Sequence, residues 1–207
     1  SVLAKSNSAK KQGVVTAETL YKAKKKCPAL RVYPPNFEFY HMMSNRMFDI
    51  LYSYTNEIEI ASIDECYLDY TKIKSKYGNE IEFAYKIQKE ILNKLGFTVN
   101  VGVANNKLCA KMASDFSKPY KVHTLFMDEV KEKMFPLPIG DLFGVGKKTA
   151  AALKEIGIFT IGDLANFSED ELRKTFKNQT NYLINSANGI DNSEVISYRS
   201  DPKCIST

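Results

Sequence analysis

The amino-acid sequence predicts an α+β fold, in which helices pack on a mainly antiparallel sheet and an all-helical region follows. Apolar residues recur at helical spacing in several stretches, and short runs with strand periodicity lie between them before residue 128. From residue 128 onward the helical period alone is found. The chain has 207 residues, 44% of them hydrophobic, which is enough to bury the core of one large domain or two modest ones.

The charge and hydropathy of the chain limit the classes of protein to which it can belong. The net charge is +5 and is carried mostly by Lys, which acts as a point charge toward phosphate rather than a reader of base edges. No apolar run is long enough to cross a bilayer, and the N-terminus lacks the apolar stretch of a signal peptide. We therefore expect a cytoplasmic protein without a membrane partner. Frequent Lys, Asn and Ile suggest a bacterium of low GC content.

The first of three blocks, residues 1–36, is basic. Its periodicity predicts a short helix from Thr16 to Lys26, with the Thr16 hydroxyl as N-cap. Cys27 and Pro28 end this helix, because a residue before proline disfavours the helical conformation.

The second block, residues 37–127, and the third block, residues 128–192, differ in the periodicity of their apolar residues. Residues 128–192 are predicted to be all-helical, and residues 193–207, which have little periodicity, are predicted to be a linker. Residues 37–127 alternate between the two periods. The elements predicted there are, in chain order, a helix over about 40–54, strands at 58–60 and 66–70, a helix over about 84–95, a strand over 98–103, and a helix from about 106 to before Pro119.

Two adjacent carboxylates, Asp64 and Glu65, lie between the first two predicted strands. Strand alternation would send them to opposite faces, but a tight hairpin can bring both to one edge of the sheet. Carboxylates gathered in this way repel each other unless a hard cation such as Mg²⁺ neutralises them, with water and substrate phosphates completing its shell. The plain alternative is a solvated Asp-Glu turn, and spacing alone favours that alternative.

A second candidate element follows the predicted strand 98–103. A helix begins near Asn106 and carries Lys107 and Lys111 one turn apart, with Lys118 just beyond its end. Lysines near a metal site can hold a triphosphate. An ordinary amphipathic helix with basic outer positions explains the same pattern equally well.

A third element is a glycine turn between two predicted helices, at Gly144, Val145 and Gly146. The glycines permit a tight turn, and the helix that follows offers unpaired N–H groups to a phosphate. The residues that would form this helix-hairpin-helix site are Gly144, Val145, Gly146, Lys147, Lys148 and Thr149. The alternative is a plain helical hairpin with a C-capping glycine.

Together these motifs resemble the Y family of translesion DNA polymerases, of the DinB and UmuC type. The run Ser62 to Asp69, Ser-Ile-Asp-Glu-Cys-Tyr-Leu-Asp, is similar to the family's palm motif, and Gly102 to Pro119 is similar to the lysine-bearing motif that follows it. The order of motifs also agrees with the family. The shorter matches are Cys27-Pro28-Ala29-Leu30 in the fingers, Ala187-Asn188-Gly189-Ile190-Asp191 at the end of the thumb, and Lys203-Cys204-Ile205-Ser206 at the start of the little finger.

The resemblance implies a division into domains. Residues 1–36 would be part of the fingers, 37–127 part of the palm with the catalytic carboxylates, and 128–192 the thumb with its helix-hairpin-helix. Residues 193–207 would be the linker to the little finger, a domain that has no counterpart in this sequence.

The resemblance also implies site residues. Asp64 and Glu65 would be catalytic carboxylates that bind two Mg²⁺ ions, and Lys118 would reach the triphosphate of the incoming dNTP. In the fingers, Lys10 would also touch phosphate, whereas Asn7 stands where DinB-type members have Tyr. The glycine hairpin from Gly144 to Thr149 would hold a phosphate of the primer–template DNA.

The implied function is template-directed transfer of nucleotides past damaged bases, in DNA repair. The family's first strand, which carries a further metal-binding carboxylate, has no counterpart, and no carboxylate precedes Glu18. We therefore expect that the parent protein polymerises and that this stretch does not polymerise alone. Recruitment by a sliding clamp would use a region beyond Thr207.

Two other functions remain open at this point. The first is a non-catalytic DNA-binding module in a degenerate homologue, which would use the glycine hairpin only. The second is a nucleotide cyclase with a related palm, which explains the carboxylate hairpin but leaves the helical region without a role.

Overall fold

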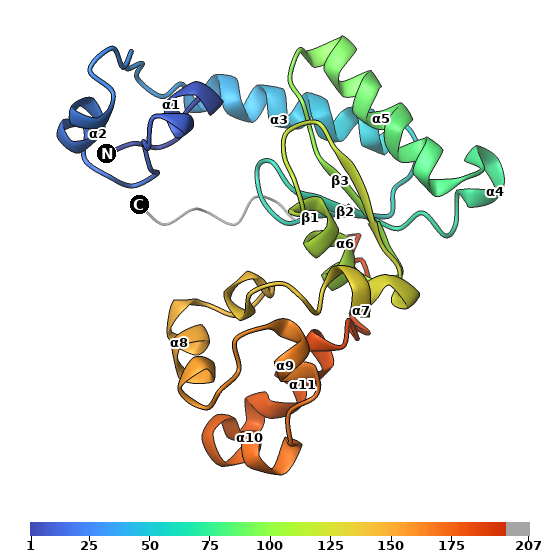
Figure 1. The fold of residues 1–207 in the computed structure, drawn as a ribbon. Coiled ribbons are helices and arrows are strands. Elements are labelled where there is room, and N and C mark those ends of the chain that lie inside the picture. The colour runs from blue at the N-terminus through green and yellow to red at the C-terminus, as the bar shows by residue number, and fades with distance from the viewer. Residues whose placement is uncertain (198–207) are drawn as a thin grey trace. The chain divides into compact units, whose positions relative to one another are not determined.

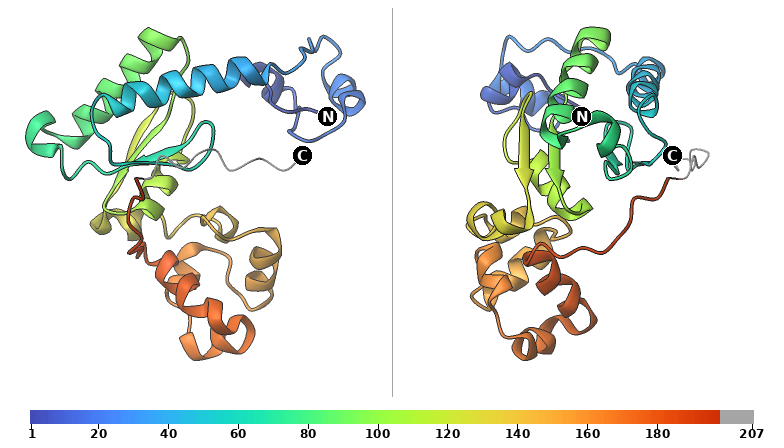
Figure 2. Two further views of the ribbon diagram at one scale, coloured as in Figure 1. Left: turned by 180° about the vertical axis from the view of Figure 1, so that it is seen from behind. Right: turned by 90° about the vertical axis from the view of Figure 1, so that its right-hand side faces the viewer.

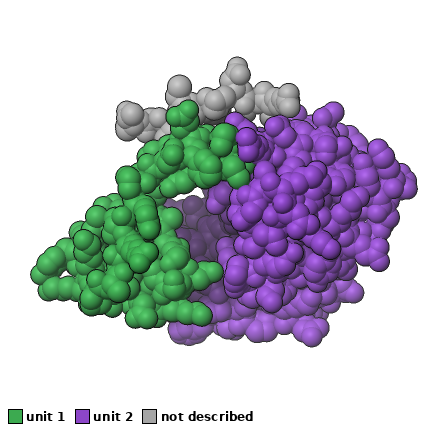
Figure 3. Space-filling view, turned by 90° about the horizontal axis from the view of Figure 1, so that it is seen from above, with its two compact units in different colours: residues 1–43 green, residues 44–207 purple. Residues whose placement is uncertain are grey.

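The computed structural model describes residues 1–197, so Lys203 to Ser206 lie outside the described residues. The chain divides into two compact units, residues 1–43 and 44–207, which Figure 3 shows in different colours. The boundary falls inside helix α3 (Phe37–Tyr52).

The first unit contains helices α1 (Asn7–Lys11) and α2 (Leu20–Lys26). The Thr19 hydroxyl caps α2 by accepting a hydrogen bond from the backbone N–H of Lys22 at 3.3 Å. The prediction that this helix begins at Thr16 was wrong, because Ala17 has a φ of +70° and interrupts helical geometry there. A small core holds the unit together, made of Val2, Ala9, Val14 and Ala23.

The second unit begins with two pairs of strands and their helices (Figure 1). Its first part contains β1 (Ile58–Ile60), β2 (Cys66–Leu68), α4 (Lys74–Tyr77), α5 (Glu80–Leu95), β3 (Val101–Ala104), α6 (Lys107–Ser114) and β4 (Val122–Leu125). The predicted hairpin, the predicted helix that ends before Gly96 and the predicted helix that begins near Asn106 are confirmed. Of the two asparagines there, Asn106 is the N-cap.

The predicted helical region, residues 128–192, contains only helices and turns as regular elements, and the last helix ends at Ala187. Figures 1 and 2 show these helices grouped together on one side of the strands. They are α7 (Val130–Lys133), α8 (Lys147–Glu155), α9 (Ile161–Ala165), α10 (Glu169–Phe176) and α11 (Thr180–Ala187), with short 3-10 turns at Met127–Glu129, Ile139–Asp141 and Lys177–Gln179. Within residues 1–197 no helix is both long and apolar enough to span a membrane.

The α+β class is confirmed, but the sheet pairing differs from the prediction. The strands β1 and β2 pair antiparallel, whereas β3 and β4 pair parallel. Strand β4 has no counterpart among the elements predicted from the sequence. A parallel pair needs a crossover connection, and α6 supplies it by carrying the chain from the end of β3 back to the start of β4.

Strand β3 separates two hydrophobic cores. Val101 packs against a cluster formed by α3, β1 and α5, whereas Ala104 packs against a cluster that joins α6 to the helices after residue 128. This follows from strand geometry, because alternate side chains point to opposite faces. On α5, the buried Gln88 side chain donates to the backbone carbonyls of Val99 and Lys121, at 2.8 and 3.0 Å, and thereby aligns the starts of both strands.

Helix α6 lies unusually close to β3 at Gly102. A Cβ added at this glycine would lie 2.0 Å from the carbonyl oxygen of Ala110 and 2.7 Å from the amide nitrogen of Ser114. Both atoms belong to the backbone of α6, so no rotamer change can relieve the overlap. The Cys109, Met112 and Ala113 side chains of this helix are buried in the second core.

We predict that Gly102→Ala lowers the free energy of unfolding by about 3 kcal/mol or more, because α6 must move away from β3 to admit the methyl group. Denaturant unfolding of the chain measures the change. Gly140→Ala is the matched control, since its added Cβ would have no neighbour nearer than 3.9 Å. Equal stability of Gly102→Ala and the parent would show that α6 is not packed on β3 in this way.

Candidate functional site

The β1–β2 hairpin presents the two carboxylates on its turn, as the sequence predicted. The backbone amides of Ala61 and Ser62 donate to the carbonyl oxygen of Glu65, at 2.9 and 3.1 Å, and close the turn. The Ser62 hydroxyl donates to the Asp64 carboxylate at 2.8 Å. Both carboxylates are exposed, so the turn displays them to solvent or to a ligand.

A buried serine fixes this turn to helix α3. The Ser44 hydroxyl donates to the backbone carbonyl of Ile63, the residue before Asp64. Ser44 is 9% exposed and lies one turn before Met47 and Phe48, which belong to the core. Sequence reasoning missed it, although a serine on an otherwise apolar helical stripe was a usable signal.

An unbroken series of ion pairs joins the hairpin to α6. Lys111 Nζ lies 2.5 Å from the Glu65 carboxylate and 3.4 Å from that of Asp115. The Asp115 carboxylate also pairs with Lys118 Nζ at 2.9 Å. The structure therefore connects Glu65, a predicted metal ligand, with Lys118, a predicted triphosphate contact. The connection runs through Lys111, which the sequence also offered as a phosphate contact, and through Asp115, which was not predicted.

These pairs shift the protonation equilibria of their members. Burial works to lower the pKa of the Lys111 ammonium, but its hydrogen bond to Glu65 and the charge of Asp115 leave that pKa above the ordinary value. Burial works to raise the pKa of the Asp115 carboxyl, but its hydrogen bond from Lys118 and the charge of Lys111 leave that pKa below the ordinary value. Both groups are therefore charged near neutral pH.

The donor chemistry of the hairpin fits Mg²⁺. Asp64 and Glu65 offer hard carboxylate oxygens, and Mg²⁺ commonly takes one or two protein carboxylates while keeping water and substrate phosphates as its other ligands. Among residues 1–197 there is no group of three or more His, Cys, Asp and Glu side chains arranged to hold a metal ion. Asp64 and Glu65 are the residues of this hairpin that could hold the ion.

Residues 189–196, here called the C-terminal strap, are attached to the start of α6. Asn106 Nδ2 donates to the carbonyl of Gly189 at 2.8 Å, and the Asp191 carboxylate accepts from the amide of Leu108 at 3.1 Å. Lys107 pairs with Glu59 on β1 at 2.7 Å and also donates to a strap carbonyl.

A pocket of about 500 Å³ lies against this strap, between strands β1 and β2, helix α6 and helix α11. The Glu59 carboxylate on its wall accepts from the amide of Ile196 in the strap at 2.9 Å. The Lys107 ammonium, which is paired with Glu59 and donates to a strap carbonyl, also lines this pocket.

The glycine hairpin has the geometry that the sequence predicted. Gly144 has a φ of +88°, a backbone conformation that favours glycine, and a Cβ there would lie 2.7 Å from the Tyr182 hydroxyl. Val145 is buried, and Gly146 is the exposed N-cap of α8. Because Gly146 has no side chain, it leaves the first N–H groups of α8, at Lys147, Lys148 and Thr149, without a side-chain cap.

The predicted phosphate contact Lys10 does not belong to the hairpin or to α6. Lys10 lies on α1, in the first unit, and is exposed.

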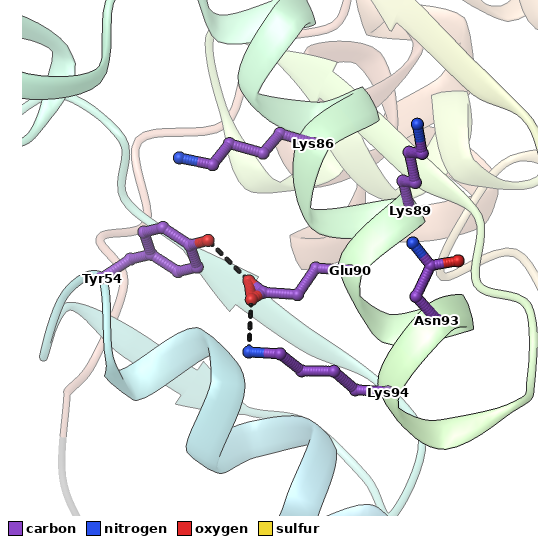
Figure 4. Close-up of a pocket in the computed structure, with 6 residues that line it drawn as sticks. All are labelled: Tyr54, Lys86, Lys89, Glu90, Asn93 and Lys94. Carbon is purple, nitrogen blue, oxygen red and sulfur yellow. Dashed lines mark hydrogen bonds and ion pairs between the residues drawn. The ribbon is translucent and has the colours of Figure 1, made fainter.

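A second pocket, of about 320 Å³, lies on α5 beside Tyr54, and Figure 4 shows Tyr54 and Lys94 both directed at Glu90. The Tyr54 hydroxyl donates to Glu90 at 2.5 Å, and burial together with this hydrogen bond raises the pKa of Tyr54 to about 12. This group ties the segment after α3 to α5, which is a structural role.

Comparisons with known proteins agree with the motifs. Residues 1–115 match the model of the impB/mucB/samB family, and residues 128–158 match that of the IMS family HHH motif. The chain is 49% identical to the DNA polymerase IV of Clostridium acetobutylicum, over 99% of this chain and 52% of the relative. It is 42% identical to DNA polymerase IV 1 of Bacillus subtilis, over 92% and 46%. The chain thus spans about half the length of these curated relatives.

Solved structures show the same similarity. A DinB family error-prone DNA polymerase from Sulfolobus solfataricus is 36% identical, with a TM-score of 0.82 over 94% of this chain and 59% of that chain. An insertion ternary complex of Dbh DNA polymerase is also 36% identical with a TM-score of 0.82, over 91% and 56%.

We predict that Asp191→Ala, which removes the carboxylate acceptor of the Leu108 amide, lowers the free energy of unfolding by about 1.5–3 kcal/mol near neutral pH. Although burial works to raise it, the hydrogen bonds from Ser193 and Leu108 hold the pKa of Asp191 below its ordinary value of 3.8. The stabilisation is therefore present above that value and is lost as the pH falls through the lowered pKa.

Denaturant unfolding at a series of pH values measures this difference. The exposed Asp141→Ala is the control, and it should change stability little at any pH. A difference between Asp191→Ala and the parent that persists unchanged at low pH would contradict the role of the carboxylate charge.

Proposed function

The chain belongs to the impB/mucB/samB family of Y-family, DinB-type DNA polymerases, and on that premise we propose that it supplies the catalytic carboxylates and the DNA-binding hairpin of a translesion polymerase. The observation that carries the proposal is the exposed pair Asp64 and Glu65 on one hairpin turn, with Lys111 and Lys118 joined to it by ion pairs. Polymerisation is proposed for the intact gene product, since the chain spans about half the length of its curated relatives.

The proposed reaction is attack of a primer 3′-hydroxyl on the α-phosphate of a dNTP, with release of pyrophosphate. Asp64 and Glu65 would hold Mg²⁺, which when bound supplies activation of the hydroxyl and neutralisation of charge on the leaving group. Ser44 and Ser62 fix the turn on which both carboxylates stand. Lys118, on the far side of Asp115, would bind the triphosphate as a point charge. Lys10 of the first unit is proposed as a further phosphate contact.

The helix-hairpin-helix would bind a phosphate of primer–template DNA. The uncapped N–H groups at the start of α8 suit an anion, and among the described residues neither Lys147 nor Lys148 forms an ion pair. Contacts of this kind do not depend on base sequence, so affinity should fall steeply with salt. The matching Dbh structure is described as an insertion ternary complex, which is consistent with this role.

The division into fingers 1–36, palm 37–127, thumb 128–192 and linker 193–207 is part of the proposal, as is a place in the bacterial cytoplasm. The second hydrophobic core crosses from α6 into residues 128–192, so the proposed palm and thumb share packed side chains.

We predict that Asp64→Ala and Glu65→Ala each reduce Mg²⁺-dependent primer extension by the intact gene product about 100-fold or more, because each removes a metal-binding carboxylate. Single-turnover extension of a labelled primer–template measures the rate. Asp170→Ala, which removes an exposed carboxylate from α10, should leave the rate unchanged. Normal extension by either hairpin variant would remove that residue from the site, and a parent without activity that still binds DNA would favour a non-catalytic module.

We predict that Gly146→Asp weakens binding of the chain to a primer–template duplex about tenfold at low salt, because it places an anion where the phosphate is proposed to lie. Aspartate is a good N-cap, so α8 should stay folded. Fluorescence anisotropy with a labelled duplex measures the affinity. Asn79→Asp is the matched control, since it adds the same charge at the exposed N-cap of α5. Equal losses in both variants would show a general charge effect and remove the hairpin from the interface.

A further inference from the structure

Asp115 is placed between two lysines of the proposed nucleotide site. It ends helix α6 as its C-cap, four residues after Lys111 and three residues before Lys118. Its two carboxylate oxygens are divided between them, Oδ1 to Lys118 at 2.9 Å and Oδ2 to Lys111 at 3.4 Å. A single carboxylate therefore pairs with both ammonium groups.

The other partner of Lys111 is Glu65, at 2.5 Å. Lys111 is thus held between two carboxylates, and its side chain is only 19% exposed. Lys118 forms its one ion pair within residues 1–197 with Asp115, and its side chain is 60% exposed. A polyphosphate that approaches these lysines meets cations that are already paired, and it meets the negative charge of Asp115 and Glu65 as well.

From this arrangement, and resting on the proposed function, we propose that Asp115 is a specificity-determining residue that competes with phosphate for Lys111 and Lys118. A polyphosphate without a cation must displace Asp115 and is repelled by it. A polyphosphate that carries Mg²⁺ has less negative charge to be repelled. The competition therefore selects the metal-bound form of the substrate over the free form.

A contribution to folding does not explain this arrangement. The Asp115–Lys118 pair is exposed, and exposed ion pairs contribute little to stability, because the charges are screened and the side chains lose freedom. The chain offers a comparison in α10, where Glu171 pairs with Lys174 at 2.8 Å, three residues apart and in the same order as Asp115 and Lys118. Glu171 forms no second ion pair among the described residues.

The test measures binding of inorganic tripolyphosphate to the chain by isothermal titration calorimetry, once with EDTA and once with Mg²⁺. The variants are Asp115→Asn and the matched Glu171→Gln, which change the net charge by the same amount at the same spacing. Thermal unfolding of each variant verifies that it is folded. A double variant, in which Lys111 and Lys118 are both replaced with Ala, is the background in which Asp115→Asn is tested again.

With EDTA, we expect Asp115→Asn to bind tripolyphosphate about two- to fivefold more tightly than the parent, the range that a half-exposed ion pair supports. Glu171→Gln should match the parent. The gain in tripolyphosphate affinity caused by Asp115→Asn should be smaller with Mg²⁺ than with EDTA. It should be absent in the variant that lacks both lysines.

Three results would overturn the proposal. Weaker or unchanged binding by Asp115→Asn would mean that Asp115 orients the lysines or does nothing to them. An equal gain in Glu171→Gln would mean that only net charge matters, and a gain that survives loss of both lysines would place the anion elsewhere. Because binding is measured without DNA and without turnover, failure here is separate from failure of primer extension.

Discussion

The close approach of α6 to β3 is the constraint on which the rest of the second unit depends. It requires Gly102, because the α6 backbone occupies the space that any Cβ would need. With its axis fixed on the strand, α6 carries Cys109 and Met112 into the core shared with the later helices, and directs Lys111 toward the hairpin. One side of the helix thus serves packing, and another serves the site.

The start of α6 is stabilised from two places in the sequence. Asn106 caps it locally by accepting from the amide of Cys109 at 2.8 Å, and Asp191 accepts from the next unpaired amide, at Leu108, from 83 residues away. Satisfying two of the orphan donors of one helix in this way ties the exit from α11 to the sheet. The path of the strap across β1 and α6 is therefore set by hydrogen bonds to particular backbone groups.

Carboxylates and lysines of the candidate site also compensate one another's charge through ion pairs. The hairpin carboxylates and the lysines of α6 were predicted as separate metal and phosphate groups, but the structure pairs them with one another. Glu65 and Asp115 each pair with a lysine of the proposed nucleotide site. Such pairs add little to folding, yet they set the electrostatic conditions that any ligand must meet.

Local chemistry determined what the sequence could predict by itself. The 3.6- and 2-residue periods located α3, α5, α6 and the β1–β2 hairpin, and the motif around Asp64 and Glu65 indicated the family. Only the tertiary structure decided the parallel pairing of β3 and β4, the anchoring of the turn by Ser44, and the long-range partners of Asp115 and Asp191. The physical reason is that period and capping act within a few residues, whereas strand order, ion-pair partners and long-range caps depend on which distant segments packing brings together.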